Sequence, residues 1–204
     1  MSEARGRKPI LVVVAGANGS GKTTLTLQLR GDRWLQGVEY LNPDAIAEQR
    51  FGGWNDPVAI RQAADLVAHL REEALREQRS LAFETVFSAP DKLDYLWRAK
   101  QAGFFIRLFF VCTDSPITNV KRVAQRVMEG GHDVPITKIL QRYERAVAQA
   151  AQAAQWVDRF YLFDNSVDGA PIRRVLRARE GRLAKTYCEP PHAVAGLLKA
   201  ALTP

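Results

Sequence analysis

The chain alternates short hydrophobic runs with longer segments in which hydrophobic residues recur every three or four positions. A short apolar run between turn residues is typical of a buried strand, and the three-to-four spacing is typical of an amphipathic helix. Proline or glycine marks most changes from one pattern to the other. Apolar strands that alternate with helices predict an α/β fold with a mostly parallel sheet and helices on both faces, in three layers.

Five runs predict the parallel strands, and two later runs around Glu180-Gly181-Arg182 predict a C-terminal hairpin. Asn-Pro, Asp-Pro and Ser-Pro pairs mark helix starts, because they place a capping residue directly before a proline in the first turn. The strands are expected at 10–15, 38–41, 81–87, 104–112 and 160–164, and the hairpin at 172–179 and 183–187. The helices are expected at 21–30, from 43, at 57–78, 90–102, 116–128, 135–157 and 192–202.

The organisation is that of one domain over residues 1–204, since a length of about 150 residues is common for a domain and no linker or repeat divides the chain. We expect a flexible tail over residues 1–9 and a helical lid segment over about 115–157. No apolar run is long enough for a membrane-spanning helix. The two cysteines, Cys112 and Cys188, form no disulfide framework, which favours a reducing cytoplasm.

The charge points to an anionic partner. The net charge is +7 and the isoelectric point is near 9.7, which suits a nucleotide, a phosphorylated metabolite or a nucleic acid. A basic surface that only keeps the protein in solution would give the same composition.

A phosphate-binding loop is the strongest motif in the chain. The segment Gly16-Ala-Asn-Gly-Ser-Gly-Lys22-Thr23 follows an apolar run, precedes a helical pattern and fits G-x-x-x-x-G-K-[ST] at every position. Its glycines let backbone N–H groups turn toward a phosphate at the positive end of a helix. The guanine-specifying N-K-x-D element is missing, which favours ATP over GTP. The residues expected to hold ATP are Gly16, Ala17, Asn18, Gly19, Ser20, Gly21, Lys22, Thr23 and Thr24, with Thr23 also on Mg²⁺.

Three carboxylates lie where strands are expected to end, the edge at which α/β sheets build their sites. Asp44 follows Asn42-Pro43, so it lies in the first turn of a helix and can act as a base, or it only complements the helix dipole. Glu84 lies in an apolar strand, where it can bind Mg²⁺ through water or contact substrate hydroxyls. The alternative is that it only lies at the solvent-exposed end of the strand. Asp164 is a second Mg²⁺ candidate, although an aspartate that caps the following turn is the more ordinary interpretation.

Arginines gather in the predicted lid. Arg122 and Arg126 are four residues apart and share a helix face, the pair Gly130-Gly131 follows, and Arg142 lies on the next helix. Arginines on a closing lid can neutralise a transferring phosphate. A helix with one solvated, charged face would show the same spacing.

The order of these motifs resembles the zeta-toxin-like P-loop kinases over roughly residues 8–168. The chain departs from toxin members at Glu84-Thr85-Val86, where they carry Glu-Gly-Thr or, in a shorter stand-alone branch, a threonine pair; the chain is closer to that branch. The matching segments are Gly-Ser-Gly-Lys-Thr at 19–23, Asn-Pro-Asp-x-Ile-Ala at 42–47, Phe-Glu-Thr at 83–85, Arg-Val-x-x-Arg-Val-x-x-Gly-Gly-His-x-Val-Pro at 122–135 and Arg-Tyr at 142–143.

The resemblance implies a kinase that uses ATP and Mg²⁺ and phosphorylates a hydroxyl of a small molecule, such as the sugar of UDP-N-acetylglucosamine. It implies Asp44 as the base, Lys22, Arg126 and Arg142 at the phosphates, and Glu84, Thr85 and Arg122 at the substrate. It also allows an antitoxin protein as a partner.

Two other functions stay open at this stage. An ABC-like or other mechanical ATPase would share the loop residues 18–25, although only Glu129-Gly130-Gly131-His132 resembles the signature segment that such ATPases need. A polynucleotide 5′-hydroxyl kinase would suit the positive charge. The sequence does not identify the phosphate acceptor, the oligomeric state or the role of the basic C-terminal strand.

Overall fold

The structure of the protein, a computed structural model, describes residues 8–30, 34–53, 56–131 and 133–203. Most of the expected N-terminal tail and His132 therefore lie outside the described residues. The described residues form seven strands in one sheet, with the order β2-β3-β1-β4-β5-β6-β7. The strands are β1 (Ile10–Ala15), β2 (Glu39–Leu41), β3 (Leu81–Thr85), β4 (Phe105–Cys112), β5 (Arg159–Asp164), β6 (Arg173–Arg179) and β7 (Arg182–Thr186).

The sheet is mostly parallel, as the pattern predicted. The five strands β1 to β5 pair in parallel, and β6 and β7 close the sheet as an antiparallel hairpin. The seven described helices are α1 (Lys22–Arg30), α2 (Pro43–Phe51), α3 (Pro57–Arg76), α4 (Pro90–Gln101), α5 (Pro116–Met128), α6 (Ile136–Ala154) and α7 (His192–Ala201). None of the described helices is long and apolar enough to cross a membrane.

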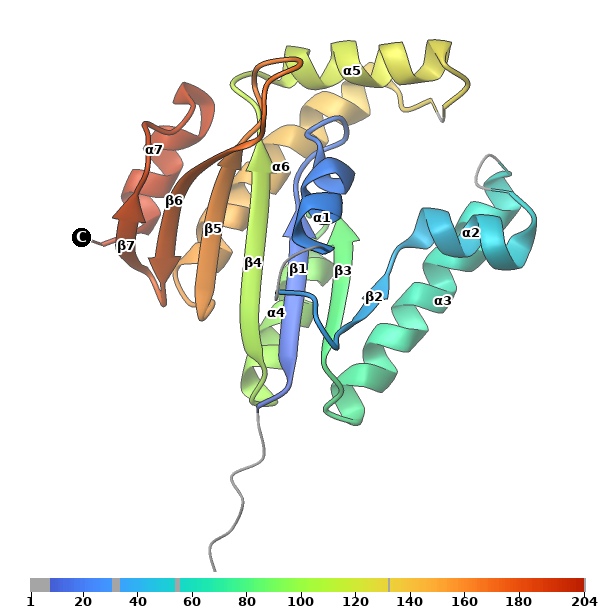
Figure 1. Ribbon diagram of the computed structural model, residues 1–204, viewed down its shortest axis with the longest axis horizontal. Coiled ribbons are helices and arrows are strands. Elements are labelled where there is room, and N and C mark those ends of the chain that lie inside the picture. The colour runs from blue at the N-terminus through green and yellow to red at the C-terminus, as the bar shows by residue number, and fades with distance from the viewer. Residues whose placement is uncertain (1–7, 31–33, 54–55, 132, 204) are drawn as a thin grey trace, which may run out of the picture.

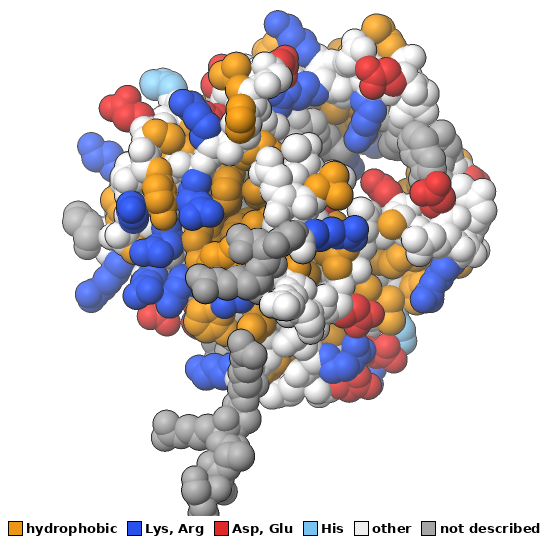
Figure 2. Space-filling view, in the orientation of Figure 1, with side chains coloured by type: hydrophobic (Ala, Val, Ile, Leu, Met, Phe, Trp, Pro, Cys, Tyr) orange, Lys and Arg blue, Asp and Glu red, His pale blue; other side chains and the backbone are white. Residues whose placement is uncertain are grey.

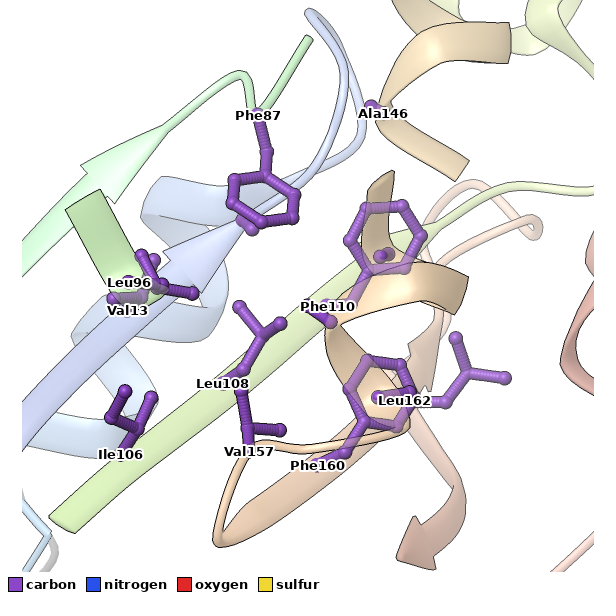
Figure 3. Close-up of a cluster of buried hydrophobic side chains, with 14 of the residues drawn as sticks. Val13, Phe87, Leu96, Ile106, Leu108, Phe110, Ala146, Val157, Phe160 and Leu162 are labelled. Atoms are coloured by element: carbon purple, nitrogen blue, oxygen red, sulfur yellow. The ribbon is translucent and has the colours of Figure 1, made fainter. Parts of the chain in front are cut away.

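Successive side chains of each strand point to opposite faces of the sheet, so the core has two layers. One face of the sheet packs against α3, α4, α6 and α7, and its buried side chains include Val13, Leu108, Phe110 and Phe160 (Figure 3). On the other face Val12 and its neighbours pack against α1 (Figure 1). The buried strand runs of the sequence are thus explained by helices on both faces.

The helix starts were predicted correctly where a polar residue precedes proline. The Asn42 side chain accepts hydrogen bonds from the backbone N–H groups of the first turn of α2, and the Ser115 hydroxyl accepts one from Ile117 N at 3.2 Å. The expected strand 81–87 was two residues too long. It ends at Thr85, because the Thr85 hydroxyl accepts a hydrogen bond from Phe87 N and Phe87 has a φ of +60°.

All five parallel strands end at the same edge of the sheet. The loop that follows β1, the start of α2, the end of β3 and the helices α5 and α6 meet there (Figure 1). The fold therefore brings together the motifs that are spread over more than a hundred residues of sequence.

Candidate active site

The loop between β1 and α1 has a shape that only glycine allows at two positions. Gly19 has a φ of +77°, and a Cβ there would lie 2.7 Å from the carbonyl oxygen of Asn119. Gly21 has a φ of +96°, and a Cβ there would lie 2.2 Å from Asn165 Nδ2. The loop leads directly into the positive end of α1, so its backbone can cradle a phosphate.

Two asparagines that the sequence did not single out hold this loop. Asn119 is fully buried, and its Nδ2 donates to the Asn18 carbonyl oxygen at 2.6 Å. Asn165 Nδ2 donates to the Ser20 carbonyl oxygen at 2.9 Å. One feature of the sequence could have indicated that Asn119 is buried. It lies one helical turn before Val123, so both side chains are on the buried face of α5. These two hydrogen bonds hold the backbone of the loop in a conformation that requires glycine at positions 19 and 21.

Lys22 of the loop is influenced by four other charged side chains. Its Nζ donates to the Ala17 carbonyl oxygen at 3.1 Å. Burial lowers the pKa of the Lys22 amine to about 8, and the nearby Arg126 and Arg142 lower it as well, while Glu84 and Asp44 oppose the shift. Charged groups from α2, β3, α5 and α6 therefore converge on one lysine of the loop.

Glu84 lies beside Thr23 at the start of α1. The Thr23 hydroxyl donates to Glu84 Oε2 at 3.2 Å, and the Tyr40 hydroxyl donates to Glu84 Oε1 at 2.5 Å. Burial and the Glu84 carboxylate raise the pKa of Tyr40 far above its usual range, so the phenol stays a donor. A hydroxyl and a carboxylate oxygen beside a phosphate loop are the donors that Mg²⁺ takes, with water and phosphate oxygens completing its shell. These residues fit the metal that the sequence implied.

Asp44 lies in the first turn of α2. Its backbone N–H is held by the Asn42 side chain at 2.9 Å, and its carboxylate is exposed. The positive end of α2 interacts favourably with an acidic side chain in its first turn. An exposed carboxyl group whose charge acts on Lys22 is a candidate to accept a proton from a hydroxyl.

Arg126 lies on α5 and Arg142 on α6, in the segment that the sequence predicted to be a lid. Arg142 Nη1 donates to Asn18 Oδ1 at 3.1 Å. Arg126 is exposed at the end of α5, where Gly131 N donates to its carbonyl oxygen at 2.8 Å. A Cβ at Gly131 would lie 2.6 Å from Arg126 Cγ, so the glycine allows the chain to pack on the stem of the arginine. Both arginines can meet a phosphate that projects from the loop.

Arg122 lies beside the loop, close to Gly19. Its guanidinium pairs with Asp168 at 2.6 Å and lies 3.5 Å from the Gly19 carbonyl oxygen. Here a pocket of about 320 Å³ opens between the start of α1 and the segment after β5. Its lining includes Thr24, Gln28, Arg122, Asn165, Gly169 and Ile172.

Two expected residues lie elsewhere. Thr85 is buried on the face opposite Glu84, and its hydroxyl accepts from Phe87 N at 3.1 Å, so it does not face the loop as a substrate residue would. Asp164 is also buried, and its carboxylate accepts from Ser166 N at 2.9 Å and pairs with Arg173 at 2.5 Å. It therefore caps the turn after β5, which confirms the more ordinary of the two interpretations of the sequence.

A family model described as zeta toxin matches residues 2–168 of the chain. No curated protein sequence matches it.

Solved structures with the same fold are distant in sequence. The complex AvrRxo1-ORF1:AvrRxo1-ORF2 with sulphate ions matches with a TM-score of 0.63 and 18% identity, over 98% of this chain and 65% of that chain. That complex has also been solved with ATP. The PezAT toxin-antitoxin system of Streptococcus pneumoniae matches at 0.57 and 16%, over 98% and 82% of the two chains. A candidate kinase from Chloroflexus aurantiacus matches at 0.52 and 22%, over 68% and 78%. These matches show that the fold is that of P-loop kinases.

Proposed function

Because the chain belongs to the zeta toxin family, we propose that it transfers the γ-phosphate of ATP to a hydroxyl of a small molecule. The observation that carries this proposal is that the phosphate loop is bonded to Arg142 at Asn18 and is followed by Thr23, which is bonded to Glu84. The charges of Asp44 and Arg126 also act on Lys22 of the loop. A site that only held a nucleotide would need the loop and its cations. A carboxylate on the opposite side of the phosphates is what transfer to an acceptor requires.

ATP fits the site in two parts. The loop and Lys22 would hold the β- and γ-phosphates. The pocket of about 320 Å³ beside Gly21 would take the nucleoside, with the Arg122 guanidinium, fixed by Asp168, along its wall. In this arrangement Arg122 would contact the nucleotide, whereas the family resemblance implies a contact with the acceptor.

Thr23 and Glu84 would hold Mg²⁺, which supplies charge neutralisation at the phosphate oxygens when bound. Tyr40 keeps one Glu84 oxygen engaged, so the other stays directed at Thr23. This assigns Glu84 to the metal side of the site, one of the two roles that its place in the sequence allowed.

The transfer step then follows from the positions of the charged groups. The Asp44 carboxylate accepts the proton of the acceptor hydroxyl as its oxygen forms a bond to the γ-phosphorus. The bond from that phosphorus to the β-γ bridging oxygen breaks, and ADP leaves. Lys22, Arg126 and Arg142 neutralise charge on the phosphoryl oxygens during this step.

A nucleotide sugar such as UDP-N-acetylglucosamine is the first acceptor to test, and an antitoxin protein is the partner that the PezAT match supports. The test is ³¹P NMR of the protein with Mg²⁺ and ATP, with and without the sugar nucleotide, and Asp44→Asn as the control. A new phosphomonoester signal that needs both the acceptor and Asp44 would support the proposal. Slow release of phosphate alone would reject this acceptor and direct the search to other metabolites.

A further inference from the structure

Helix α3 carries an arginine at a position where its buried face otherwise holds apolar residues. The buried side chains of α3 are Ala59, Ala63, Val67, Arg71 and Ala74, which follow the three-to-four spacing of one helix face. Arg71 is only 8% exposed. Burying a guanidinium is costly unless its charge and its N–H groups find partners, so the surroundings of Arg71 decide what this position does.

Two aromatic rings hold the Arg71 guanidinium in place. Its central carbon lies 4.9 Å from the centre of the Phe83 ring on β3 and 5.2 Å from the centre of the Tyr95 ring on α4. The Tyr95 hydroxyl also donates to the Arg71 carbonyl oxygen at 2.9 Å. Such rings stabilise a cation and fix its plane, but they offer no oxygen to the five N–H groups of a guanidinium.

The carboxylates whose charge acts on Arg71 are bound to other cations. Glu72 accepts hydrogen bonds from both terminal nitrogens of Arg98, at 2.7 and 2.8 Å, and Asp91 pairs with Lys92. No described residue accepts a hydrogen bond from the Arg71 guanidinium, and its Nε is buried without an acceptor. Burial lowers the pKa of Arg71, although Asp91 and Glu72 oppose the shift. The positive charge of Arg71 is therefore only partly compensated.

The outer end of the Arg71 guanidinium reaches the solvent. Of its three nitrogens, Nε alone is both buried and without a partner. Since no described group accepts a hydrogen bond from Nη1 or Nη2 either, these two terminal nitrogens are in contact with solvent. A small ligand can therefore reach the two nitrogens of Arg71 that point away from its helix.

The strand register places Arg71 on the side of the site that holds Asp44. Phe83, on which Arg71 stacks, lies opposite Leu41, the residue that leads into the start of α2. Phe83 also directly precedes Glu84, and the two side chains point to opposite faces of the sheet. Arg71 thus lies close to the ends of β2 and β3, on the face away from Thr23.

The helices around Arg71 border the same region. Ala47 of α2 forms a buried cluster with Ala59 and Ala63, on the face of α3 that carries Arg71. Helix α4 begins soon after the end of β3, and the charge of Asp91 in its first turn acts on Arg71. In Figure 1, α2 and α3 stand at the β2 side of the sheet, and Figure 2 shows the surface hollowed between α2 and the body of the molecule. An acceptor held between α2 and the phosphate loop would lie beside the segment that carries Arg71.

We propose that Arg71 binds an oxyanion, the phosphate or carboxylate group of an acceptor whose hydroxyl receives the γ-phosphate. This inference rests on the proposed function and adds to it that the acceptor is itself an anion. A guanidinium suits both groups, because two parallel N–H groups can meet two oxygens. An oxyanion would supply the hydrogen-bond acceptors that Arg71 lacks, to a cation whose plane the two rings have already fixed.

The first test is NMR of the full chain with ¹⁵N-labelled arginine, loaded with ADP and Mg²⁺ so that the phosphate loop is already filled. Arg71→Lys identifies the guanidinium signals of Arg71 by their loss, and Arg61→Lys identifies those of an exposed arginine on the same helix. We expect the Arg71 signals to shift saturably with inorganic phosphate or acetate up to about 50 mM, which fills a site of millimolar affinity. Chloride at the same ionic strength should have no such effect, and the Arg61 signals should follow ionic strength alone. A response to only one of the two anions would show which group the site takes.

The second test is transfer of label from [γ-³²P]ATP to metabolites that have first been separated into neutral and anionic fractions. We expect a labelled product in the anionic fraction alone. Arg71→Lys keeps the charge but loses the paired N–H groups, so the amount of this fraction that gives half the maximal rate should rise about tenfold. The maximal rate and the KM for ATP should stay close to those of the wild type, and Arg61→Lys should match the wild type throughout.

Two results would overturn the proposal. One is the absence of a saturable response of the Arg71 signals to either anion, which would show that only water meets this guanidinium. The other is label in the neutral fraction alone. A response to anions without any transfer would keep the anion site and reject the proposed kinase activity, whereas transfer without a response would do the reverse, so the two failures are distinguishable.

Discussion

At the scale of single residues, Asp44 carries the step on which the proposed reaction depends. Its carboxylate is exposed at the start of α2, and its charge acts on Lys22 of the phosphate loop. Asp44→Asn keeps the shape of the side chain and removes the base. We expect the rate of phosphate transfer to fall by about 10²- to 10⁴-fold, with ATP affinity unchanged in calorimetry. Full activity of this variant would show that another group takes the proton.

Lys22 makes ATP binding depend on pH. With a pKa of about 8, the free amine is largely neutral above pH 8, whereas bound phosphates favour the ammonium form. Binding should therefore take up a proton near pH 8.5, and ATP affinity should fall as the pH rises through 8. Calorimetry in two buffers with different ionisation enthalpies measures the uptake, which should shrink toward pH 7. Affinity that rises with pH would contradict this pKa.

Tyr40 tests whether Glu84 serves the metal. Tyr40→Phe removes the hydrogen bond to Glu84 Oε1 and leaves the ring in place. We expect Mn²⁺ affinity of the ADP complex, measured by electron paramagnetic resonance, to fall about fivefold, with ADP affinity in the absence of metal unchanged. Tyr95→Phe is the matched control, since that hydroxyl donates to the Arg71 carbonyl oxygen far from the loop. Equal effects of the two variants would show a structural role only.

At the scale of elements, the phosphate loop depends on helix α5. Asn119 is fully buried and joins the loop at Asn18 to the end of β4 through Thr113. Asn119→Ala leaves the Asn18 carbonyl oxygen without this donor, whereas the Thr113 hydroxyl keeps the Ser115 carbonyl oxygen as an acceptor. We therefore expect a loss of about 1–3 kcal/mol in the free energy of unfolding and weaker ATP binding. Denaturant unfolding measures the first, and Gln125→Ala, an exposed site on the same helix, is the control. Stability equal to that of the control would exclude this supporting role.

The helices, strands and loops also differ in how well the sequence predicts them. The loop at Gly16–Thr23 and the helix start at Asn42 were predictable, because their residue types act through local backbone geometry. Asn119 was not, because its partner Asn18 is 101 residues away and only the packing of α5 brings them together. The turn-capping role of Asp164 was also predictable, because it acts on Ser166 two residues away, whereas its pairing with Arg173 depends on the packing of β6 against β5.

At the scale of the whole molecule, the two ends of the sheet have different chemistry. The edge where the parallel strands end gathers the loop, two arginines and two carboxylates. The hairpin β6–β7 extends the sheet away from this edge and carries basic residues on both of its strands. A net charge of +7 predicted an anionic partner without indicating where it binds, and the fold offers the phosphate loop for it.

The central claim is that this site phosphorylates a small molecule. Transfer of label from [γ-³²P]ATP to a metabolite extract tests it with many possible acceptors present at once. The account predicts a labelled phosphomonoester in the small-molecule fraction with the wild type and none with Asp44→Asn. Label found only in polynucleotide or protein, or equal labelling by both proteins, would contradict it.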